Sequence, residues 1–135
     1  MALSLFTVIS LAVIYRVTIN FTKLPYSSQL RHPGSQEFLH TNEQIARSME
    51  RLLKSIPGEH KASVLTYRYH QVIGTLVTLD VYSNVPNSAI RTTIERATRR
   101  GHIGRFAVSG EGFEFHVIKG ECPSCCFQYF LTCIL

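Results

Sequence analysis

Hydrophobic and polar residues alternate most clearly over residues 63–83, SVLTYRYHQVIGTLVTLDVYS. A period of two is typical of a pleated strand, whose successive side chains point to opposite faces. Residues 70–74 interrupt the alternation and contain the only glycine of this run, so they form a short connection between two strands. We therefore predict a long antiparallel hairpin, which needs a cover over its apolar face to be stable in water.

Two further segments show the same period. Residues 14–21, IYRVTINF, alternate Tyr, Val, Ile and Phe with Arg, Thr and Asn, which predicts a strand with one apolar and one polar face. Phe113, Phe115 and Val117 alternate with other residues just before Lys119 and predict a last strand. Residues 102–108 are too short and irregular to assign.

Apolar residues spaced three or four apart predict two helices that can supply the cover. The first has a stripe made by Phe38, Ile45, Met49, Leu52, Leu53 and Ile56. It is expected to start near Ser35 and to end at Pro57-Gly58, because proline cannot continue the hydrogen-bond ladder and glycine can take a left-handed turn.

The second predicted helix follows the hairpin. Its apolar face is made by Ile90, Ile94 and Ala97. We expect Asn84 or Ser83 to cap its start, with Pro86 in its first turn, and Gly101 to end it.

The predicted order is strand, helix, strand, strand, helix, strand. This is an α+β fold of the ferredoxin-like βαββαβ type, in which two helices cover one face of a four-stranded antiparallel sheet. We assign it to residues 14–119. The 135 residues leave room for one such domain, and 45% hydrophobic with 17% charged residues is typical of a globular chain.

The first thirteen residues, 1–13, depart from this composition. They are almost wholly apolar but short for a membrane span, and they lack the basic start of a secretory signal. Three interpretations stay open: an atypical or truncated signal, the remnant of a membrane anchor, or a misplaced start site.

Residues 120–135 form a tail that we expect to lie outside the domain. It contains all four cysteines of the chain: Cys122, Cys125, Cys126 and Cys133. Cys122 and Cys125 have CxxC spacing, but no second pair completes a zinc or redox site. The tail could belong to a following module, be part of a membrane segment, or result from a mispredicted end.

The formal net charge of +5 is unevenly distributed. Only one acid, Glu95, accompanies a cluster of five arginines: Arg91, Arg96, Arg99, Arg100 and Arg105. Such a cluster can attract a polyanion, but it is also typical of a solvated helix face. The stretch lacks the interleaved aromatic residues that stack on bases, so we expect no nucleic-acid partner.

The motifs of a pocket enzyme are missing from the sequence. It has no G-x-G-x-x-G, phosphate loop or G-x-S-x-G motif. Scattered histidines lack the spacing of a zinc site: His40, His60, His70, His102 and His116. We expect no catalytic pocket, no metal and no cofactor.

Two short motifs could carry glycans. Asn20-Phe21-Thr22 is an N-glycosylation sequon at the end of the first strand. The run from Ser109 to Gly112, SGEG, matches the S-G-x-G pattern on which glycosaminoglycan chains are built. Because it leads straight into the last strand, we expect a turn of small residues there, with glycosaminoglycan attachment at Ser109 as the alternative.

The order and spacing of several short sequence runs resemble those of the SEA domain family. Within that family they are most similar to the modules of basement-membrane heparan sulfate proteoglycans. These runs are IYRVTINFT, YSSQLRHPGSQEF, IPG, SVL, VTLDV and GEGFEFHVI, between residues 14 and 118. The resemblance implies the same βαββαβ fold in an extracellular module, secreted or at the cell surface and often glycosylated. We expect partners among matrix or cell-surface glycans and proteins, with heparan sulfate as a candidate partner of the arginine cluster, and contact with a membrane only through a missing or truncated anchor.

Many SEA domains cleave themselves, by attack of a serine hydroxyl on the strained carbonyl before it in the turn between the second and third strands. The nearest match is Gly74-Thr75, whereas alignment on VTLDV puts the family's cleavage point near Gln71-Val72. We therefore expect a non-catalytic module that acts as a spacer and interaction unit. Self-cleavage at Gly74-Thr75 and polyanion binding are the alternatives.

Overall fold

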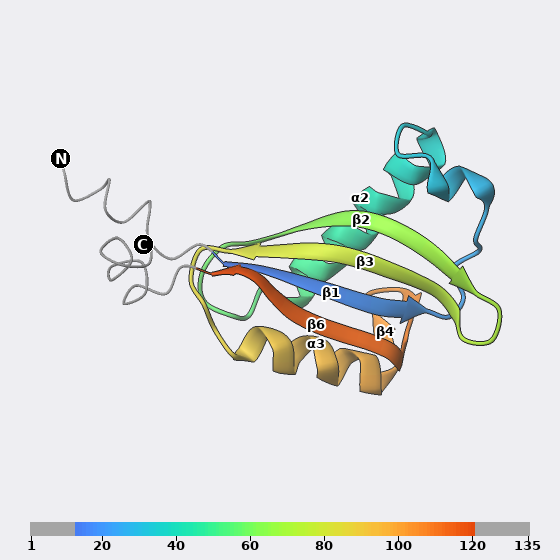
Figure 1. The fold of residues 1–135 in the computed structure, drawn as a ribbon. Coiled ribbons are helices and arrows are strands. Elements are labelled where there is room, and N and C mark those ends of the chain that lie inside the picture. The colour runs from blue at the N-terminus through green and yellow to red at the C-terminus, as the bar shows by residue number, and fades with distance from the viewer. Residues whose placement is uncertain (1–12, 121–135) are drawn as a thin grey trace.

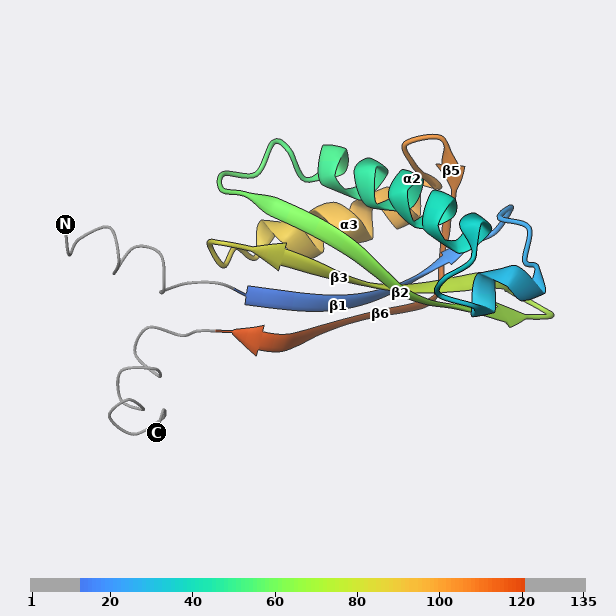
Figure 2. The same ribbon diagram turned by 90° about the horizontal axis from the view of Figure 1, so that it is seen from above.

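The computed structural model describes residues 13–120, in which two helices cover one face of a four-stranded antiparallel sheet (Figures 1 and 2). The strands lie in the order β2-β3-β1-β6. Their bounds are β1 (Val13–Phe21), β2 (His60–His70), β3 (Gly74–Ser83) and β6 (Ser109–Gly120). The predicted α+β fold of the ferredoxin-like type is confirmed.

The core lies between the sheet and the helices, and β1 is one of the two inner strands of the sheet. Val17 and Ile19 of β1 are fully buried and pair with Leu79 and Val77 of β3. Alternate residues of β1 therefore face the helices, while Arg16 and other polar residues face the opposite, open side of the sheet.

The first helix, α2 (Gln36–Leu52), begins as predicted, since the Ser35 hydroxyl accepts a hydrogen bond from the Phe38 backbone N–H at 3.1 Å. It ends earlier than predicted. Leu53 and Ile56 continue the buried stripe at 0% and 6% exposure, but they do so in turns after the helix. A short 3-10 helix, η1 (Ser28–Arg31), precedes α2 and buries Leu30.

The second helix, α3 (Ala89–Arg100), ends as predicted at Gly101, whose φ of 99° is left-handed. The predicted start was wrong. Asn84 accepts a hydrogen bond from the Glu59 backbone N–H, which lies in the preceding loop, whereas Asn87 accepts one from the Ala89 backbone N–H. Pro86 lies before the helix, whose N-cap is Ser88, four residues after Asn84.

The segment that the sequence left unassigned forms a small second sheet from β4 (His102–Ile103) and β5 (Phe106–Ala107). Ile103 is 1% exposed and anchors this ribbon in the core. The ribbon thereby connects the end of α3 to the surface of α2, on the helical side of the sheet (Figure 2).

The two described ends lie side by side. Val13 and Gly120 are register partners in the β1–β6 pair, so the chain enters and leaves the domain at the same end (Figure 1). The four cysteines and most of the apolar start lie outside the described residues. Within residues 13–120, no helix is long and apolar enough to cross a membrane, and no group of side chains is suited to hold a metal ion.

Burial of Tyr67 makes the free energy of unfolding depend on pH. Its hydroxyl donates to Asn42 Oδ1 at 2.6 Å, and its ring meets Phe38 edge-on with centroids 5.6 Å apart. Burial raises the pKa of Tyr67 far above its usual value. In the unfolded chain a tyrosine ionises near pH 10, so the unfolded state releases this proton first and the free energy of unfolding falls above about pH 10.

We expect Tyr67→Phe to flatten this alkaline loss of stability, because phenylalanine has no proton to release. Urea unfolding at a series of pH values from neutral to strongly alkaline measures it. If the free energy of unfolding falls with rising pH as steeply in Tyr67→Phe as in the wild type, Tyr67 is not the cause of the alkaline loss of stability.

Candidate functional site

Three of the residues that the sequence marks for chemistry meet at the end of the sheet where β3 and β6 begin (Figure 1). Asn20 pairs with Ser109 in the β1–β6 ladder, and Gly74 lies against the Asn20 side chain. We call the group formed by Asn20, Ile73, Gly74 and Ser109 the Asn20 joint. It connects the inner strand β1, the turn between β2 and β3, and the edge strand β6.

Asn20 is fully buried at 0% exposure. Its Nδ2 donates to the Ile73 carbonyl at 2.7 Å and to Ser109 Oγ at 3.1 Å. A buried amide that lost these bonds would leave donors and acceptors unpaired, at a cost of about 1–3 kcal/mol for each group. The side chain is therefore a structural cross-link between segments far apart in sequence.

Gly74 is required at this position for two reasons. Its φ of +127° lies in the region that favours glycine. A Cβ on Gly74 would also come within 2.6 Å of Asn20 Oδ1, an atom that has no hydrogen-bond partner among the described residues. The glycine thus makes room for the Asn20 amide, and no chemical role is needed to explain it.

The hydroxyl of Thr75, the candidate nucleophile, already forms a hydrogen bond with another carbonyl. Its side chain is buried, and Oγ1 donates to the Leu24 carbonyl at 2.9 Å. Its backbone pairs with Phe21 on one side and Tyr69 on the other. Attack on the Gly74 carbonyl would require release of the Leu24 bond inside a paired strand.

The alternative cleavage position has no nucleophile. Alignment puts it near Gln71-Val72, in the turn between β2 and β3. This turn, QVI, contains no hydroxyl side chain, and Val72 is 84% exposed. Neither position brings a free hydroxyl to a strained carbonyl.

The first residue of the sequon, Asn20, belongs to the Asn20 joint. An N-linked glycan would be attached to Asn20 Nδ2, the atom that makes both buried hydrogen bonds. Because Asn20 has no exposed surface, the folded domain leaves no room for a sugar at this nitrogen.

Ser109 is also part of the structure, as the first residue of β6. Its Oγ accepts from Asn20 Nδ2 and, at 3.3 Å, from the Glu111 backbone N–H. The expected turn over residues 109–112 was wrong, since these residues belong to the strand. An irregularity in the register between Thr18 and Asn20 accommodates them.

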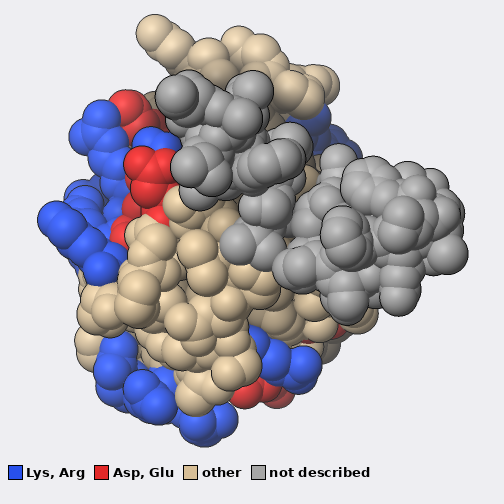
Figure 3. Space-filling view, turned by 90° about the vertical axis from the view of Figure 1, so that its left-hand side faces the viewer, with Lys and Arg blue, Asp and Glu red and all other residues tan. Residues whose placement is uncertain are grey.

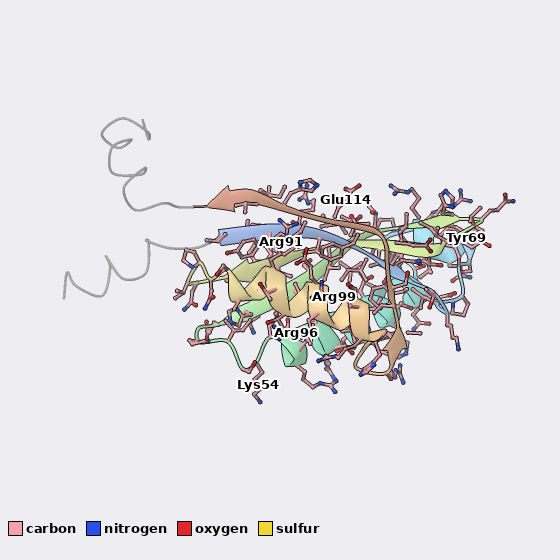
Figure 4. All side chains as sticks on the ribbon, turned by 90° about the horizontal axis from the view of Figure 1, so that it is seen from below. Lys54, Tyr69, Arg91, Arg96, Arg99 and Glu114 are labelled. Atoms are coloured by element: carbon pink, nitrogen blue, oxygen red, sulfur yellow. The ribbon has the colours of Figure 1, made fainter. Side chains whose placement is uncertain are left out.

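The five arginines of the predicted cluster fall into different surroundings. Arg91 pairs with Glu95 at 3.2 Å and lies 5.4 Å from the centroid of the Phe115 ring. Arg105 lies on the β4–β5 turn and donates to Gln44 of α2. The remaining three are exposed on α3: Arg96, Arg99 and Arg100. Figure 4 shows Arg96 and Arg99 on the same helix as Arg91.

Positive charge is also divided on one end face of the molecule. Figure 3 faces the end of the molecule where the described chain begins and ends, and it shows Lys and Arg in separate groups around the rim of this face. Asp and Glu side chains lie beside some of these groups. On the visible part of this face, positive charge does not form one continuous patch (Figure 3).

An ion pair on the open face of the sheet was missed by sequence reasoning. Arg16 Nε and Nη2 contact Asp80 Oδ1 and Oδ2 at 2.8 and 2.9 Å, and the Asp80 side chain is only 8% exposed. The hydrogen bond to Asp80 raises the pKa of Arg16. Next to this pair, the hydroxyls of Thr18 and Thr78 lie 3.0 Å apart.

The sequon allows a sharp test of the joint, because Asn20 and Thr22 can be changed separately. Asn20→Ala removes both hydrogen bonds and should lower the free energy of unfolding by about 2–3 kcal/mol. Thr22→Ala destroys the sequon equally, but Thr22 is exposed, so stability should change by less than about 0.5 kcal/mol. Urea unfolding of protein secreted from mammalian cells measures both.

The same protein should show no change in mass on treatment with peptide N-glycosidase. A glycan on Asn20, or a loss of stability in Thr22→Ala as large as in Asn20→Ala, would show that the motif acts as a sequon and would contradict the joint.

Comparison with known families agrees with this fold. The model of the SEA domain matches residues 13–102, from the first residue of β1 to the first residue of β4. The matched range includes both helices, three strands of the main sheet and the hairpin turn at the Asn20 joint. Because the match extends over more than half of the sequence, the chain belongs to the SEA domain family.

Proposed function

We propose that this chain is a non-catalytic extracellular module that stays intact and acts as an interaction unit of a perlecan-like proteoglycan, or of a related matrix or membrane-tethered glycoprotein. SEA domains occur in extracellular or cell-surface proteins and are generally non-catalytic. The order of the sequence runs between residues 14 and 118 supports the likeness to perlecan. Basement membrane is accordingly the proposed location.

The observation that carries this proposal is the state of Thr75. Self-cleavage needs a free hydroxyl and a strained bond before it. Here the hydroxyl is buried and donates to Leu24, and the residue with the unusual φ is glycine, which adopts it without strain. Both requirements are unmet, which favours an uncut chain.

The geometry of the ends favours an interaction unit over a spacer. Val13 and Gly120 lie on neighbouring strands, and such strands are about 5 Å apart. Segments attached at these two points would leave the domain together. The module would therefore project to one side of a longer protein and add little to its length.

The intact state is tested by mass spectrometry under denaturing conditions after prolonged incubation at neutral pH. We expect one species of 15.3 kDa. The variant Thr75→Ser, which supplies the family's usual nucleophile, should also stay whole because its hydroxyl can make the same bond to Leu24. Two fragments that add up to the intact mass plus one water, with a new N-terminus at Thr75, would refute the proposal.

A polyanion, with heparan sulfate as the leading example, is the second candidate partner. It is favoured by the arginines of α3 that form no ion pair within residues 13–120: Arg96, Arg99 and Arg100. Exposed positive charge of this kind raises the local concentration of anionic glycans and loses its effect in salt.

A further inference from the structure

A second group of basic residues lies where the β4–β5 turn meets α2. Five polar side chains line a recess of about 360 Å³ there: Gln44, Arg47, Ser48, Arg51 and Arg105. We call it the Arg105 recess. Only Arg105 belongs to the arginine cluster that the sequence indicates, and the other four side chains come from α2.

The backbone of the β4–β5 turn packs closely against α2 beside the recess. Gly104 has a φ of +59°, and a Cβ at this residue would come within 2.9 Å of Ser48 Oγ. The turn therefore lies directly on α2, with Ile103 buried beneath it. Arg105 follows immediately and is attached to a part of the chain that packing holds in place.

Two contacts also hold the Arg105 side chain. Its Nη2 donates to Gln44 Oε1, and its guanidinium lies 5.4 Å from the centroid of the Phe106 ring. A guanidinium has five N–H donors, and this single hydrogen bond leaves most of them available to a ligand. The arginine is thus positioned before any ligand binds.

The other two arginines of the recess, Arg47 and Arg51, form few ion pairs with carboxylates. Arg47 pairs with Glu43 at 2.7 Å, but both side chains are more than half exposed, and such pairs contribute little. Arg51 forms no ion pair within the described residues. Three guanidinium groups line the recess, no carboxylate lines it, and only Arg47 has an ion-pair partner among the described residues, so positive charge is in local excess.

Ser48 adds a neutral hydrogen-bonding group. The residue is only 7% exposed, and its side chain lines the recess. A serine hydroxyl both donates and accepts hydrogen bonds. It can therefore donate to an oxygen atom of a ligand that enters the recess.

We propose that the Arg105 recess binds one sulfate monoester group of a sulfated glycan. Arginines present planar pairs of N–H donors that match the oxygens of a tetrahedral oxyanion, and Ser48 can donate one more hydrogen bond. The choice of sulfate rests on the proposed extracellular function. Arg96 and Arg99 are exposed on α3, and we expect them to act through their general positive field.

Matched double variants test the site with a fully sulfated heparin hexasaccharide as the probe. Arg51→Ala with Arg105→Ala removes two charges from the recess, and Arg96→Ala with Arg99→Ala removes two from α3. All four residues are exposed, so both proteins should keep the wild-type melting temperature. Calorimetric titration should show a loss of affinity of about tenfold or more for the recess variant and about twofold for the α3 variant.

The outcomes separate this inference from the polyanion candidate. Equal losses in the two variants, or a larger loss in the α3 variant, overturn the recess but keep polyanion binding by the module. No binding of the hexasaccharide to the wild-type protein overturns both, while the module can still be intact and non-catalytic by mass spectrometry.

Two further probes identify the anion. A hexasaccharide without sulfates but with its carboxylates should not bind, and binding equal to that of the sulfated form would overturn the proposal. Glucose 6-sulfate and glucose 6-phosphate carry the two tetrahedral anions on one sugar. Larger shifts of the Ser48 and Arg105 amide signals by the phosphate in NMR spectra would assign the recess to phosphate esters and overturn the choice of sulfate.

Discussion

The requirement that a buried amide must find hydrogen-bond partners determines one end of this domain. Asn20 has no exposed surface, so its Nδ2 has to bind protein atoms, and it binds the Ile73 carbonyl and the Ser109 hydroxyl. Both partners are far away in sequence. The turn of the hairpin and the start of the edge strand must come to β1 together, and Gly74 must lack a side chain for the amide to fit.

This constraint changes the meaning of several short motifs. The sequon, the S-G-x-G run and the Gly-Thr pair each have a chemical interpretation when considered alone. In the structure Asn20 and Ser109 bind each other, Gly74 lies against Asn20, and the Thr75 hydroxyl binds Leu24. Function is therefore to be sought outside the joint, on surfaces such as the Arg105 recess on the helical side of the sheet (Figure 2).

Local signals in the sequence predicted much of the fold. Ser35 caps α2 and Gly101 ends α3 because each depends only on residues within one helical turn. Asn84 was assigned to the wrong partner because its hydrogen bond goes to Glu59, 25 positions earlier. Periodicity placed Arg16 and Asp80 in strands, but their pairing over 64 positions depends on strand register, which periodicity does not contain. The Arg105 recess was hidden for the same reason, since the turn and α2 lie far apart in the sequence.

The most direct test of the central claim is the coupling between Asn20 and Ser109 in a double-mutant cycle. Asn20→Ala, Ser109→Ala and the double variant are unfolded in urea beside the wild type. If the two side chains act as one joint, the double variant loses about 1 kcal/mol less than the sum of the single variants. Strictly additive losses would contradict the account, because they would show that the two residues act independently.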